Sequence, residues 1–174
     1  MMAEHPHRFS TTVFAEMRGV SDEKGNSPFW QWLEEHFFSI DFKLADYLTG
    51  IGKKGFIADL MPKLPIYINL LSKEAQAVIG QVHENTKPAL RLLEKEGFTC
   101  RNYVDIFDGG PSVECEVRNI ESVRHSFRAK VTIAPHASSQ NYLISNTSFE
   151  HFRATAAKAA YDQESESVIV SPEV

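Results

Sequence analysis

Two helices with clear start and stop signals stand in the middle of the chain, and they constrain its fold more than any other feature. Ser72 is placed to cap the first helix and Asn85 or Thr86 to cap the second, because these side chains accept backbone N–H groups at a helix N-terminus. Gly97 stands where a helix ends on a left-handed residue, and Phe98 can fold back onto the last turn. We therefore expect two short helices separated by a brief joint.

A β-hairpin is expected directly after the second helix. The runs Tyr103–Phe107 and Val113–Val117 have strand composition, and the Asp-Gly-Gly-Pro sequence between them is typical of a hairpin turn. In the second run, apolar residues alternate with glutamates, which predicts one buried and one solvated face. Other expected elements are a helix at 27–38, a helix or irregular segment at 39–48 and a partly buried strand at 13–20. Short strands are expected at 56–60 and 168–170, and a half-buried strand at 127–133. Residues 134–147 are expected to form a polar loop, and 149–161 is an ambiguous segment whose alanine content favours a helix. This mixture predicts the α+β or α/β class, with a β-rich C-terminal tail.

Composition excludes several classes of protein. A chain of 174 residues can bury a real core, and a net charge of −5 argues against nucleic acid or an anionic membrane as the main partner. Cys100 and Cys115 have neither the spacing of metal ligands nor the number needed for a disulfide framework. No apolar run is long enough to cross a bilayer, and the N-terminal residues lack the apolar core of a signal peptide. We therefore expect a cytoplasmic protein.

Residues 50–55 match the pattern G-x-G-x-x-G, which in a dinucleotide site follows a strand and begins a helix. Here the expected order is reversed, with a helix before the glycines and the strand 56–60 after them. The segment is therefore interpreted as a flexible turn, and a dinucleotide cofactor is rejected.

One of the seven histidines, His83, stands in the joint between the two central helices. A loop histidine is either a solvated residue, which is the commoner case, or an acid–base group held between rigid elements. None of the histidines has the spacing of a zinc site, so no metal is expected.

Four acidic residues surround the expected hairpin: Asp105, Asp108, Glu114 and Glu116. They can form a carboxylate fork for a cationic substrate, because a guanidinium group pairs with carboxylates in a bidentate manner. They can equally be a solvated hairpin edge that is protected from aggregation by its charge. The sequence leaves both interpretations open, with the solvated edge somewhat ahead.

Five short strings occur in the order found in one family of enzymes. They are Ala15-Glu16-Met17-Arg18-Gly19-Val20, Ser27-Pro28-Phe29-Trp30, Phe56-Ile57-Ala58-Asp59-Leu60-Met61-Pro62, Ile79-Gly80-Gln81-Val82-His83 and Asp105-Ile106-Phe107-Asp108-Gly109-Gly110-Pro111. From about residue 9 to about residue 124 the chain resembles the C-terminal part of arginine N-succinyltransferases, which belong to the acyl-CoA N-acyltransferase superfamily.

The resemblance implies a fold and a reaction. The implied fold is an incomplete acyltransferase-like mixed sheet with packed helices over residues 1–124, followed by a β-rich tail over residues 125–174. The implied reaction transfers a succinyl group from succinyl-CoA, a co-substrate and not a permanent cofactor, to the α-amino group of L-arginine or, in some members, L-ornithine. The family's catalytic proton donor corresponds to His83, and Asp105 and Asp108 are candidate ligands for the guanidinium group.

The resemblance also implies that part of the enzyme lies outside this chain. The family's phosphate-binding turn, which would cradle the CoA pyrophosphate at a helix N-terminus, is expected before residue 1. The chain is then a fragment, one half of a split enzyme, or a truncated remnant, and it is expected to form a homo-oligomer or to associate with the missing half. The alternative function is a non-catalytic module that keeps the fold and an oligomer interface.

Overall fold

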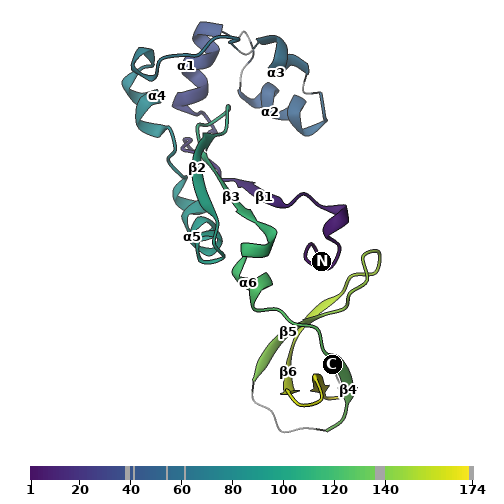
Figure 1. The fold of residues 1–174 in the computed structure, drawn as a ribbon. Helices are drawn as coiled ribbons and strands as arrows, with labels where there is room; N and C mark the ends of the chain where they lie inside the picture. The colour runs from purple at the N-terminus through teal and green to yellow at the C-terminus, as the bar shows by residue number, and fades with distance from the viewer. Residues whose placement is uncertain (38–39, 41, 54, 61, 136–139, 173–174) are drawn as a thin grey trace. The chain divides into compact units, whose positions relative to one another are not determined.

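The computed structural model describes residues 1–37, 40, 42–53, 55–60, 62–135 and 140–172 (Figure 1). The chain divides into two compact units. One unit is Thr12–Glu116, and the other joins Met1–Thr11 to Val117–Val174. The domain boundary expected near residue 124 stays a prediction.

The sheet of the unit Thr12–Glu116 has three antiparallel strands in the order β1-β3-β2. These strands are β1 (Thr12–Glu16), β2 (Thr99–Val104) and β3 (Pro111–Glu116). Val113 and Cys115 on β3 are buried, whereas Glu116 is exposed, so the predicted alternation is confirmed. The hairpin is also confirmed, but its first strand ends at Val104 because residues 105–108 form a turn. The strand expected at 13–20 ends at Glu16, and Phe14 is exposed on its outer face.

The helices of this unit lie between β1 and β2 in the sequence. They are α1 (Pro28–Phe37), α2 (Phe42–Gly50), α3 (Gly55–Leu60), α4 (Lys73–Val78) and α5 (Lys87–Lys95), with 3-10 turns at Ile68–Leu70 and Glu84–Thr86. Figure 1 shows α1 to α4 gathered at one end of the sheet, and α1 packs against α4. Trp30, Leu33 and Ala45 form a buried cluster, and the Trp30 ring lies 5.1 Å from the Phe107 ring. None of the described helices has the length and apolar character needed to cross a bilayer.

The start and stop signals of the two central helices are confirmed except for the cap of the second. Thr86 stands at the N-cap position of α5, but its side chain forms no capping hydrogen bond. The Ser72 hydroxyl accepts the backbone N–H of Ala75 at 3.2 Å and so caps α4. Gly97 has a φ of 95° after α5, and Phe98 donates its N–H to the Leu93 carbonyl at 3.0 Å. This is the closure that a left-handed glycine permits.

The strand expected at 56–60 is wrong, because this segment is the helix α3. A short apolar run cannot be assigned to strand or helix by periodicity alone, and none of the strands in the described part of the chain pairs with it. The segment at 39–48 contains the start of α2; residues 38–39 and 41 lie outside the described part. The glycine-rich segment therefore connects the helices α2 and α3, and no strand precedes it as a dinucleotide site would require.

The second unit contains a four-stranded mixed sheet in the order β4-β7-β6-β5. Its elements are 3-10 turns at Pro6–Arg8 and Val117–Asn119, the helix α6 (Glu121–Arg124), and the strands β4 (Lys130–Ile133), β5 (Asn141–Ser145), β6 (Ala154–Asp162) and β7 (Ser167–Val170). β4 and β7 are parallel, and the other pairs are antiparallel. Ala159, Val168 and Val170 form its buried cluster. The α+β class and the β-rich tail are thus confirmed.

Three predictions for this unit are wrong. The polar loop expected at 134–147 contains β5, although residues 136–139 lie outside the described part. The helix favoured at 149–161 is largely β6, because pairing with β5 and β7 outweighs the helix propensity of alanine. The strand expected at 127–133 exists as β4, but it is not half-buried, since Val131 is 59% exposed and Ile133 is 68% exposed.

Candidate functional site

Three segments that are distant in the sequence meet within the unit Thr12–Glu116. We call the meeting point of residues 17–20, 80–83 and 105–111 the glycine junction. His83 donates its backbone N–H to the Arg18 carbonyl at 2.9 Å, and Gly19 forms an isolated antiparallel bridge with Val82. Gly80 donates its N–H to the Gly109 carbonyl at 2.7 Å. The loop that carries His83 is therefore attached to both other segments through the backbone.

The His83 side chain is partly buried and has one contact with its own loop. The ring Nδ1 accepts the backbone N–H of Asn85 at 3.2 Å, and the backbone carbonyl of His83 accepts the N–H of Thr86 at 2.8 Å. In the neutral ring this contact leaves the proton on Nε2. No hydrogen bond to Nε2 is formed by the residues that the structure describes, so in this tautomer the Nε2–H is available as a proton donor.

Asp108 lies at the centre of the glycine junction and is partly buried. Its Oδ2 accepts the N–H of Gly19 at 2.7 Å, and its Oδ1 accepts the N–H of Gly110 at 2.9 Å. Hydrogen bonds to an ionised carboxylate are stronger than those between neutral groups. Asp108 therefore joins the segment after β1 to the segment before β3.

Asp105 organises the turn that carries Asp108. Its Oδ1 accepts the N–H of Phe107 at 2.8 Å, and its backbone N–H donates to the Gly110 carbonyl at 2.7 Å. Burial raises the pKa of the Asp105 carboxyl above its ordinary value, although the N–H of Phe107 opposes this rise. The negative charge of Asp108 raises the Asp105 pKa further.

Two glycines allow the backbones to approach this closely. A Cβ on Gly19 would lie 2.5 Å from the Asp108 carbonyl oxygen and 2.6 Å from the Asp108 carboxylate. A Cβ on Gly110 would lie 2.1 Å from the Met17 carbonyl oxygen. These neighbours are mostly backbone atoms that cannot move aside, so the junction requires glycine at both positions.

The four acidic residues expected around the hairpin do not form one cluster. Asp105 and Asp108 both belong to the glycine junction, whereas Glu114 faces Arg101 on the neighbouring strand, with its Oε1 3.4 Å from the Arg101 Nε. Glu116 is at the exposed end of β3. Within the described part of the chain, no group of histidine, cysteine, aspartate or glutamate residues is arranged to hold a metal ion.

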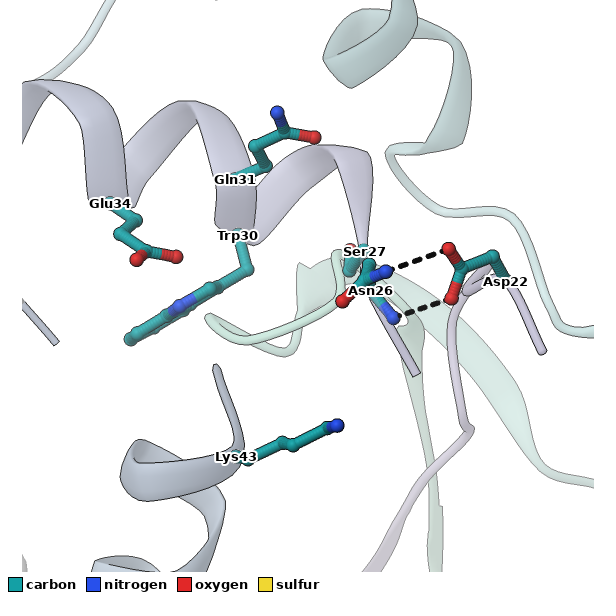
Figure 2. A pocket seen from close by; sticks show the side chains of 7 residues that line it. All are labelled: Asp22, Asn26, Ser27, Trp30, Gln31, Glu34 and Lys43. Atoms are coloured by element: carbon teal, nitrogen blue, oxygen red, sulfur yellow. Dashed lines mark hydrogen bonds between the residues drawn. The ribbon is translucent and has the colours of Figure 1, made fainter. Parts of the chain in front are cut away.

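A polar cleft of about 540 Å³ lies where α1 begins, and no sequence motif predicted it (Figure 2). It is lined by Asp22, Asn26, Ser27, Trp30, Gln31, Glu34 and Lys43. Asp22 accepts the backbone and side-chain N–H groups of Asn26, each at 2.8 Å, and these bonds lower the Asp22 pKa. The Ser27 hydroxyl is buried and has no hydrogen-bond partner among the described residues. Ser27 was expected only as the first residue of a helix and as part of one family string, and no sequence pattern marked residues 22–27 as a site.

Comparisons with known proteins cover the whole chain. A family model described as arginine N-succinyltransferase beta subunit matches residues 1–122, and one described as its C-terminal domain matches residues 127–174. The chain is 49% identical to an arginine N-succinyltransferase of Escherichia coli, over 99% of this chain and 50% of that protein. It is 53% identical to one of Citrobacter koseri, over 88% of this chain and 45% of that protein.

A solved structure is also similar. Arginine/ornithine succinyltransferase subunit AI from Pseudomonas aeruginosa matches with a TM-score of 0.82 and 35% sequence identity, over 99% of this chain and 48% of that chain. The chain thus spans about half the length of the curated relatives that it matches.

Proposed function

The chain belongs to the arginine N-succinyltransferase family, and we propose that it forms part of an enzyme that transfers a succinyl group from succinyl-CoA to the α-amino group of L-arginine. Succinyl-CoA acts as a co-substrate, and no permanently bound cofactor is required. L-Ornithine is the second acceptor to be tested, because the similar subunit from Pseudomonas aeruginosa is named for both amino acids.

His83 is the acid–base group of this proposal. The α-amino group of the acceptor must lose a proton when it attacks the thioester, and the departing thiolate must gain one. An imidazole titrates near neutral pH and can serve either transfer. The main supporting observation is the attachment of the His83 loop to the glycine junction, which fixes the backbone of a partly buried histidine. To accept the amine proton at Nε2 the ring must adopt the other neutral tautomer, with Nδ1 protonated and its hydrogen bond from Asn85 released. The resulting imidazolium can then donate the Nε2 proton to the departing thiolate.

The guanidinium ligands are a separate part of the proposal. Asp105 and Asp108 were predicted to bind this group, and that role stays a prediction. Both oxygens of Asp108 and the Oδ1 of Asp105 already accept backbone N–H groups, so a guanidinium group would have to share these atoms. The partner of the chain is either a second copy or the remaining half of the enzyme.

The test measures CoA release by the complete enzyme that contains this chain, with arginine and with ornithine as acceptors. His83→Ala should lower kcat about a hundredfold to ten-thousandfold, which is the usual contribution of a general acid or base. His125→Ala is the matched control, because this exposed histidine follows α6 and its ring interacts, among the described residues, with Glu121 of that helix. Equal turnover by His83→Ala and the parent enzyme would remove His83 from the mechanism and favour the non-catalytic alternative.

A further inference from the structure

We propose that Asp108 is a positioning residue for His83, and that it acts through the single peptide group between Arg18 and Gly19. This inference rests on the proposed role of His83. It assigns Asp108 to the histidine loop instead of to the guanidinium group of the substrate.

The two ends of one peptide group carry the connection. The N–H of Gly19 donates to Asp108 Oδ2 at 2.7 Å, and the carbonyl of Arg18 accepts the N–H of His83 at 2.9 Å. This N–H and this carbonyl belong to the same planar unit, so they cannot rotate independently. The Asp108 carboxylate therefore fixes the direction of the carbonyl that holds the His83 backbone.

The Asp108 carboxylate also strengthens the hydrogen bond from the His83 N–H to the Arg18 carbonyl. An anion that accepts the Gly19 N–H polarises the peptide group, and hydrogen bonds in a chain reinforce one another in this way. The Arg18 carbonyl consequently becomes a better acceptor for the N–H of His83. A neutral residue in place of Asp108 would supply less of this polarisation.

Asp108 is suited to this role because both of its oxygens accept. Gly19 and Gly110 donate to different oxygens of the same carboxylate, at 2.7 and 2.9 Å. An asparagine has one carbonyl oxygen, so its amide nitrogen would face one of the two N–H groups. Asp108→Asn keeps nearly the same shape and removes one of the two bonds, which makes it the informative substitution.

The experiment uses the complete enzyme and compares Asp108→Asn with Asp162→Asn. Asp162 is a matched control, because it also accepts a backbone N–H in a turn, from Glu164 at 3.1 Å, but it is exposed in the other unit. Asp108→Asn should lower kcat at least about tenfold and leave the KM for arginine within about twofold, as expected for a residue that acts on the reacting geometry and not on substrate binding. Asp162→Asn should change neither.

Two further readouts separate positioning from general loss of structure. In enzyme labelled with ¹⁵N-histidine, the exchange of the His83 amide hydrogen should accelerate at least about tenfold in Asp108→Asn, since its acceptor is no longer fixed. In the His83→Ala background, Asp108→Asn should cause no further loss of kcat, because residues that act as one unit are not additive. If Asp108→Asn fails to fold by circular dichroism, Asp108→Glu is measured in the same assays.

The outcomes distinguish the two proposals. A tenfold or larger rise in the KM for arginine with unchanged kcat would overturn the positioning role and assign Asp108 to the guanidinium group. Unchanged His83 amide exchange in Asp108→Asn would overturn it as well. If His83→Ala alone keeps full turnover, the proposed function fails, whereas the amide exchange still decides whether Asp108 holds the His83 backbone.

Discussion

Replacing Gly110 by alanine should destabilise the unit Thr12–Glu116 more than a glycine-to-alanine substitution at any other position of that unit. The new Cβ would lie 2.1 Å from the Met17 carbonyl oxygen and 2.5 Å from the Gly19 backbone nitrogen. A carbon and an oxygen normally approach no closer than about 3.3 Å. The two backbones must therefore separate by about 1 Å at the point where they cross.

The magnitude follows from the hydrogen bonds that this separation breaks. Met17 donates its N–H to the Pro111 carbonyl at 3.0 Å, and Gly19 donates to the Asp108 carboxylate at 2.7 Å. A partly buried group that loses its partner costs about 1–3 kcal/mol, and groups bonded to a charge lie at the upper end. We expect Gly110→Ala to lower the free energy of unfolding by at least about 3 kcal/mol.

Gly50→Ala is the matched control for this substitution. Gly50 is the last residue of α2 and does not have a positive φ. Apart from its chain neighbours and the backbone of its own helix, no described atom lies within 4 Å of its added Cβ. Alanine should therefore be neutral there, or stabilising by up to about 1 kcal/mol. Both variants carry the same chemical change, so the difference between them isolates the close approach at the glycine junction.

Urea unfolding followed by tryptophan fluorescence measures both variants, because the two tryptophans, Trp30 and Trp32, lie on α1 in the same unit. With a slope of about 1–3 kcal/mol per molar urea, the midpoint of Gly110→Ala should fall at least about 1 M below that of Gly50→Ala. Midpoints that agree within about 0.3 M, at equal slopes, would refute the crossing geometry described here.

Two other predictions concern a buried charge and a pair of facing residues. Burial raises the Asp105 pKa in the folded protein, so the folded state binds this proton more tightly than the unfolded state does. The stability that the native carboxyl contributes should therefore fall as the pH rises from the unfolded-state pKa of about 3.9 through the higher folded-state pKa. Urea titrations at pH 4 and pH 7 should show Asp105→Asn gaining stability relative to the parent at the higher pH, and an unchanged difference would contradict the assignment. In the other unit, Val170 is 5% exposed, whereas its register partner Ile133 is 68% exposed. On the isolated chain, Val170→Ala should therefore lower the free energy of unfolding by about 1.5–2.5 kcal/mol, and Ile133→Ala should lower it by at most about 0.5 kcal/mol. Equal losses in denaturation followed by circular dichroism would show that the burial pattern of this sheet is different.

Features that depend on a few neighbouring residues were predictable from the sequence. The Ser72 cap, the left-handed Gly97 and the alternation along β3 are all confirmed. Each of these signals acts over about one helical turn or one strand, so the physical cause and its effect lie within the same short segment.

Elements whose local preference is weak needed the tertiary structure. The run at 56–60 suits a strand in composition but forms α3, and the alanine-rich run at 154–162 suits a helix but forms β6. In both cases the surrounding chain decides, since β6 is held by pairing on both sides whereas α3 has no strand beside it.

The same distinction between local signals and tertiary packing applies to the candidate site. The sequence determined that His83 lies in a joint between two helices and that Asp108 belongs to the hairpin turn before β3. It placed Asp105 in the first hairpin strand, whereas the structure ends that strand at Val104. It could not reveal that Asp108 reaches Gly19, which is 89 positions away, or that Arg18 holds the backbone of His83. Those contacts exist because backbones cross at distances that only glycine permits, and such a crossing is a property of the packed chain and not of any one segment.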